Sequence, residues 1–132
     1  MSDDSKTSWE RGLKVVDQVY GAGASGMMQG GEDSPFIFET VAHLFGDLWG
    51  DSTLSIRDKR LMVLGATAML GNAELVEIQL IGAIVNGELT DAQLDEIPRF
   101  LLFYAGAGNT TALYKGIQAA KAKAKGRSKA SG

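Results

Sequence analysis

The chain has 132 residues, a formal net charge of −3, and hydrophobic and charged fractions of 45% and 22%, values typical of one globular domain. The negative charge argues against nucleic acid as the main partner, since phosphate binding needs a basic surface. The absence of cysteine excludes disulfides, thiolate nucleophiles and cysteine metal sites.

The N-terminal stretch MSDDSKTSWERG is polar and acidic, so it does not predict a signal peptide. No apolar run approaches the roughly 20 residues that a membrane-spanning helix needs. We therefore expect a cytoplasmic protein with no membrane partner.

The spacing of apolar residues and glycines predicts an all-α, single domain of about six helices. Its core is expected over about 8–122, with flexible ends at 1–7 and 123–132. The first helix is expected to begin after an N-cap at Ser8 and to end before Gly21.

Repeated glycines over 22–33 predict a mobile loop, which either covers a site or is only a flexible connection between helices. Ser34 and Pro35 then form an N-cap and first-turn proline, a pair that favours a helix start. This second helix is expected to run to about Trp49.

A third helix is expected after Ser55 as N-cap, with Asp58 in its first turn favoured by the helix dipole. From Leu61 to Leu70 it is apolar or small on every side. A helix without a polar face is buried all round. In so small a domain this pattern predicts contacts between subunits as well as within one.

Asn72 is expected to cap the fourth helix and Gly87 to end it. Thr90 and Gln93 have the spacing of a capping box at the start of the fifth helix. Pro98 is expected to kink that helix, because proline lacks a backbone donor and clashes with the preceding turn.

Five segments in this order carry a family likeness: RGLKVVDQVYG, FGDLWG, LSIRDKRLMVLGATAMLG, ELVEIQLIGAIVNGELTDAQLDEI and FYAGAGNTTAL. Over about residues 10–120 they resemble the carboxymuconolactone decarboxylase family, within the wider alkylhydroperoxidase-like superfamily. The resemblance implies a compact all-helical subunit that self-associates as a ring-like homo-hexamer or homo-trimer. It also implies a cofactor-free lyase acting on a small acidic lactone of aromatic catabolism.

The chain departs from this family at its reactive positions. The peroxidase branch uses a Cys-x-x-Cys pair on the helix matching 74–87, so the lack of cysteine excludes thiol peroxidase activity by that route. The decarboxylase branch has a histidine where Gln79 stands, and an amide is no general acid or base near neutral pH. The family's basic position falls on Lys59 or Arg60, and its proline after Tyr-x-Gly is Gly108.

Three residues are candidates for the catalytic role. Gln79 could orient a ligand carboxylate or be a core amide bonded to a neighbour. His43, the only histidine, follows Glu39 by four residues, so the two form either an acid–base pair or a surface ion pair. Glu74 matches an acidic family position, but negative charge at a helix start also suits the dipole. A lone histidine without cysteine argues against a zinc site.

Four residues are candidates for substrate binding. Arg60 could grip an acidic ligand with two hydrogen bonds, or form a salt bridge between subunits. Trp49 and Tyr104 could line the same pocket or simply pack. Asn86 precedes Gly87 and is expected mainly to shape the helix end.

The sequence therefore supports two hypotheses. The first is a carboxymuconolactone decarboxylase-like enzyme, in which Gln79 and Arg60 stabilise enolate charge and His43 supplies the proton. The second is a catalytically degenerate oligomer that has kept the fold for binding or structure. A different enzyme in the same pocket is a third possibility, since fold does not fix chemistry.

Overall fold

The computed structural model describes the backbone of residues 1–131 and the side chains of residues 1–126. Over that backbone the chain forms six α-helices and two other helical segments, with no β-strand. The all-α prediction is therefore confirmed. The chain divides into two compact units, 1–56 and 57–132, and each is described by itself. The expectation of a single domain stays a prediction.

The first unit begins with α1 (Asp3–Tyr20), which starts six residues earlier than predicted. The side chain of Ser2, not Ser8, is the N-cap and accepts a hydrogen bond from the backbone N–H of Ser5. Two aspartates in the first turn suit the helix dipole, although in the sequence they resemble a polar tail. Gly21 ends the helix, as expected, with a φ of 107°.

The rest of this unit is a 3₁₀ turn η1 (Ala24–Met28), α2 (Pro35–Glu39) and a wide helical stretch η2 (Thr40–Trp49). The glycine-rich segment 22–33 is thus partly ordered as η1. Ser34 caps α2 and Pro35 follows it, as predicted. In η2 the backbone N–H of Gly50 bonds to the carbonyl of Phe45, which is π-helical spacing.

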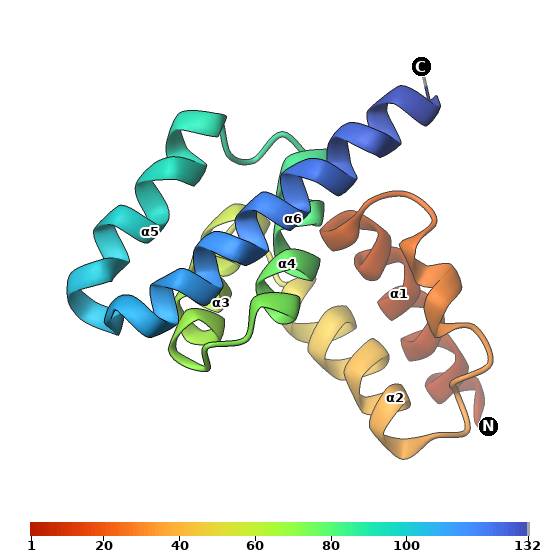
Figure 1. The fold of residues 1–132 in the computed structure, drawn as a ribbon. Coiled ribbons are helices and arrows are strands. Elements are labelled where there is room, and N and C mark those ends of the chain that lie inside the picture. Colours follow the sequence, from red (N-terminus) through yellow and green to blue (C-terminus); the bar gives the residue numbers. More distant parts are fainter. Residues whose placement is uncertain (132) are drawn as a thin grey trace. The chain divides into compact units, whose positions relative to one another are not determined.

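The core of the first unit lies between α1 and η2 (Figure 1). Trp9, Val16 and Val19 from α1 are buried there with Val41. The backbones approach closely because Gly12 has no side chain: a Cβ at that position would lie 2.0 Å from the carbonyl oxygen of Val41.

The second unit contains α3 (Ile56–Met69), α4 (Ala73–Val85), α5 (Asp91–Ala105) and α6 (Ala107–Ser131). The side chain of Asn72 caps α4, as predicted. Thr90 and Gln93 form the predicted capping box of α5. Pro98 lies inside α5, and the helix continues through it to Ala105.

Helix α6 runs along both α4 and α5 (Figure 1). Ten side chains form the common core: Leu64, Ala68, Val76, Leu80, Ala83, Leu89, Leu94, Leu113, Ile117 and Ala120. The helix continues to Ser131, so the segment 123–131 is helical. The flexibility expected over 123–132 stays a prediction, and Gly132 lies outside the described residues.

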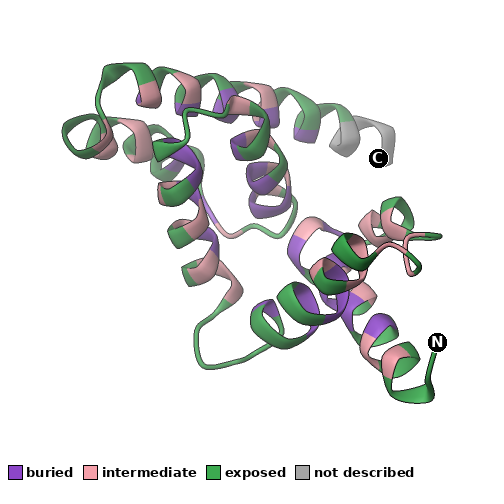
Figure 2. Ribbon diagram, turned by 90° about the horizontal axis from the view of Figure 1, so that it is seen from below, coloured by how far each residue is buried: buried purple, intermediate pink, exposed green. Residues whose placement is uncertain are grey.

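Burial of α3 differs from the expectation. Leu64, Thr67 and Ala68 are buried, but Met62 and Met69 are 64% and 57% exposed. The single chain thus covers only one side of this helix, and burial of the other sides through contacts between subunits stays a prediction. Figure 2 shows the same sidedness along most helices, with buried and exposed residues alternating. Among the described residues no helix is both long and apolar enough to cross a membrane.

Candidate functional site

The end of α4 places a carboxylate beside the first turns of α3. Gly87 adopts a φ of +67° and donates its N–H to the carbonyl of Ile84, and Glu88 donates its N–H to the carbonyl of Ala83. These two bonds form a Schellman motif, which reverses the chain where the sequence reads Asn-Gly. Arg57 on α3 fixes the turn from the other side, because its Nε donates to the Glu88 carbonyl at 3.0 Å.

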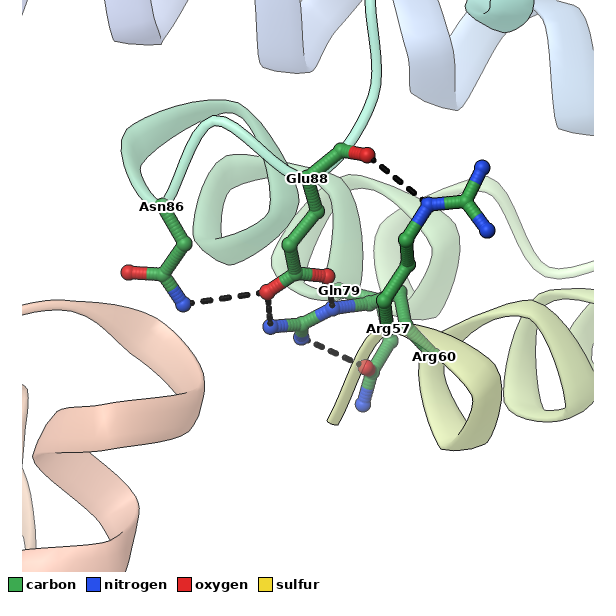
Figure 3. Close-up of polar contacts among 5 residues, drawn as sticks. All are labelled: Arg57, Arg60, Gln79, Asn86 and Glu88. Atoms are coloured by element: carbon green, nitrogen blue, oxygen red, sulfur yellow. Dashed lines mark hydrogen bonds and ion pairs between the residues drawn. The ribbon is translucent and has the colours of Figure 1, made fainter. Parts of the chain in front are cut away.

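Arg60 lies at the centre of the resulting cluster (Figure 3). Its Nε and Nη2 donate to the two carboxylate oxygens of Glu88 at 3.1 and 3.0 Å. Its Nη1 donates to Oε1 of Gln79 at 3.0 Å. Asn86 donates to Oε2 of Glu88 at 3.1 Å. We call Arg60, Gln79 and Glu88 the arginine cluster.

The arginine cluster is almost completely withdrawn from water. The Arg60 side chain is 0% exposed, that of Glu88 is 9% exposed, and Gln79 is 9% exposed as a residue. A buried guanidinium is tolerated only with paired charge and satisfied donors. The fork of a guanidinium matches a carboxylate bidentately, which a lysine cannot do. The buried position at the start of α3 is therefore Arg60, whereas Lys59 is only half-buried.

His43 belongs to the first unit, on η2, and is a surface residue. Its side chain is 49% exposed, and its Nδ1 lies 2.5 Å from Oε2 of Glu39. The ring of Phe38 meets the imidazole edge-on at 6.0 Å. The hydrogen bond with Glu39 raises the pKa of His43 above its ordinary value, and the nearby charges of Glu39 and Asp47 act in the same direction. Both side chains of this pair are open to solvent.

The other candidates lie outside the arginine cluster. Trp49 is buried in the first unit, 6% exposed, with its ring stacked 6.2 Å from Phe45. Glu74 is exposed in the first turn of α4. Tyr104 is 75% exposed on α5 beside Phe100, 5.5 Å between ring centroids. The structure thus joins Gln79 directly to Arg60, and connects Asn86 to them through Glu88.

Glu88 is not singled out as a site residue by the sequence analysis. It lies in the turn between two helices, where GELTDAQLDE offers several acidic residues as ordinary surface charge. One signal was present: an arginine in an apolar helix requires a carboxylate within reach. The Asn-Gly pair before Glu88 marks the turn that supplies it. Among the described side chains, no group of three or more His, Asp or Glu is placed to hold a metal ion.

Comparison with known proteins agrees with this architecture. The profile of the carboxymuconolactone decarboxylase family matches residues 38–122, which include η2 and the whole arginine cluster. The chain belongs to the carboxymuconolactone decarboxylase family. No curated protein and no solved structure matches it.

Proposed function

We propose that this chain is a non-catalytic, self-associating member of the family. Helix α4, on which the resemblance places the family's reactive residue, serves here as a structural element. The observation that supports this most is the buried, bidentate pair of Arg60 and Glu88, with Gln79 as a third partner.

The chemistry of Gln79 supports the proposal. The resemblance places a histidine there, and an amide exchanges no proton near neutral pH. Its oxygen already accepts a hydrogen bond from Arg60. A substrate carboxylate could bind Arg60 only by displacing Glu88, which would leave a buried carboxylate without its cation. The cluster is thus arranged to hold α3, α4 and the turn after α4 together.

The family match favours a second candidate, a cofactor-free decarboxylase of a small acidic lactone. In that mechanism Arg60 and Gln79 would stabilise the enolate as carbon dioxide leaves, and an acid would then protonate the carbon. Glu88 would have to release Arg60 first.

A turnover assay separates the two candidates. Purified full-length protein is incubated with carboxymuconolactone, and loss of the lactone and release of carbon dioxide are followed against buffer alone. The proposal predicts the uncatalysed rate for wild type, for Gln79→Ala and for the control Asp95→Asn, at an exposed residue of α5. Saturable turnover by wild type that Gln79→Ala abolishes and Asp95→Asn leaves intact would establish the decarboxylase instead.

Exposed apolar side chains support the self-association. Besides the two methionines of α3, the side chains of Leu75, Ile78 and Val85 on α4 are 39–49% exposed. The three residues of α4 are spaced by three and seven positions, so they share one face of the helix. An uncovered apolar face is typical of a protein–protein interface. Size-exclusion chromatography with light scattering is expected to give a homo-trimer or homo-hexamer. A monomer at all concentrations would contradict the proposal.

A further inference from the structure

Helix α5 presents an aromatic face to solvent. Phe100, Phe103 and Tyr104 are 60%, 88% and 75% exposed, and the rings of Phe100 and Tyr104 pack on each other. An aromatic side chain carries roughly 150–250 Å², so these three offer roughly 350–550 Å² at their exposures. That is a large part of the ~800 Å² that each partner contributes to a standard interface.

A groove lies along the same helix and is lined by residues of α5 and α6. Its volume is about 290 Å³, and seven residues line it: Pro98, Arg99, Leu102, Ala107, Thr110, Thr111 and Tyr114. The hydroxyl of Thr110 donates to the backbone carbonyl of Gly106, and that of Thr111 donates to the carbonyl of Ala107. The threonines therefore present mainly their methyl groups, and the lining is largely apolar.

The aromatic face and the groove lie on different sides of α5. Leu94, Ile97 and Leu101 mark the side that faces the core. With about 100° per residue, Leu102 lies about a quarter turn to one side of this line. Phe100 lies about a quarter turn and Tyr104 about a sixth of a turn to the other side, and Phe103 lies nearly opposite the core. One helix thus carries an apolar projection and an apolar recess that point in different directions and adjoin only where Arg99 and Phe103 share a face.

We propose that the aromatic face of α5 in one copy of this chain inserts into the α5–α6 groove of a second copy. Projection and recess are different surfaces, so the contact is head-to-tail, and repeating it closes a ring when the rotation allows. Arg99 at the groove contributes as well: its side chain is 84% exposed and lies 3.6 Å from Glu96, so its guanidinium can turn over an incoming aromatic ring. This inference rests on the self-association proposed above and names its surface.

The test uses full-length variants of each half of the contact. Phe100→Ser combined with Tyr104→Ser removes the projection, and Thr111→Arg fills the groove. Both changes are at exposed positions, so the helical circular dichroism and the thermal midpoint should stay close to wild type. Light scattering after size exclusion is expected to show a lower mass for each variant. Met27→Ser, a 79% exposed residue of η1, is the matched control and keeps the wild-type mass.

Mixing the two variants tests the head-to-tail geometry. Each retains the half that the other lacks, so an equimolar mixture is expected to form a complex with both variants in equal numbers. Absence of that complex would overturn the head-to-tail contact. Wild-type mass in both variants would overturn this surface while leaving self-association in place. A monomeric wild type would overturn both.

Discussion

Arg60 is the residue that makes the arginine cluster a structural site. Its guanidinium is fully buried, and its hydrogen bonds run to Glu88 and Gln79 of the same chain. In a low-dielectric interior such a pair contributes little net stability compared with apolar residues, but losing one partner is costly. The cluster therefore ties three chain segments to one conformation.

Replacing Glu88 by alanine should reveal the loss of stability that follows when one partner of the buried pair is removed. The variant leaves the Arg60 guanidinium buried without its anion, and we expect the free energy of unfolding to fall by about 3–5 kcal/mol. Urea denaturation followed by circular dichroism measures it. Asp95→Ala is the matched control, because Asp95 pairs with Lys121 in an exposed bridge that should contribute about 1 kcal/mol or less. Equal effects of the two substitutions would contradict the role of the arginine cluster.

His43 gives a prediction for pH. Its folded-state pKa is raised by the hydrogen bond with Glu39, so the pair's contribution to stability is fully present below the unfolded pKa of about 6.5. That contribution is lost as pH rises through the higher folded value. NMR titration of the single imidazole should show a pKa above 6.5 in wild type and a lower one in Glu39→Gln. An unchanged value in the variant would remove Glu39 as the cause.

For single residues, the sequence locates Gln79 and Arg60 but not the hydrogen bond between them. Their positions came from the family resemblance, whereas the contact depends on how α3 and α4 pack. Glu88 was hidden because a carboxylate in a turn looks the same whether it faces water or an arginine. Burial of a side chain depends on how the whole chain packs, so the neighbouring residues in the sequence predict it poorly.

The elements themselves were easier to predict. Asn72, Thr90 and Gly87 act locally, through bonds to neighbouring backbone groups, so their helix ends follow from sequence alone. The start of α1 was missed because Ser2 and two aspartates can belong either to a polar tail or to a capped first turn. The wide turns of η2 have no sequence signature of this kind.

Close approach of α4 and α6 depends on Gly116. A Cβ there would lie 2.7 Å from the carbonyl oxygen of Ala73 and 2.6 Å from the side chain of Val76. We expect Gly116→Ala to lower the free energy of unfolding by about 1–3 kcal/mol through overpacking. Gly126→Ala in the same helix meets nothing within 4 Å and should stabilise by up to about 1 kcal/mol. Chemical denaturation of both variants checks the sign; stabilisation by both would show that α6 can move away.

For the whole molecule, the exposed apolar surface is the feature that a single chain leaves unexplained. Sequence correctly identified α3 as apolar, but the single chain covers only one of its sides. No local sequence pattern identifies the partner that would cover the other sides of α3. Helix content was predictable because periodicity is local, whereas the grouping of helices into two compact units depends on long-range packing.

Self-association has a thermodynamic signature. If subunits associate only when folded, mass action makes the thermal midpoint rise with protein concentration. We expect differential scanning calorimetry over a roughly hundredfold concentration range to show this rise in wild type. The Phe100→Ser, Tyr104→Ser variant should show a smaller rise. A midpoint independent of concentration in wild type would indicate that the monomer is the folding unit.

The free energy of unfolding of Gln79→Ala shows whether the arginine cluster holds the fold or a substrate. The substitution removes an acceptor from a buried guanidinium, so we predict a loss of about 1.5–3 kcal/mol. Glu74→Gln on the same helix should change it by about 0.5 kcal/mol or less. Catalytic residues are often held at a cost to stability. An unchanged or higher stability of Gln79→Ala would therefore contradict the account.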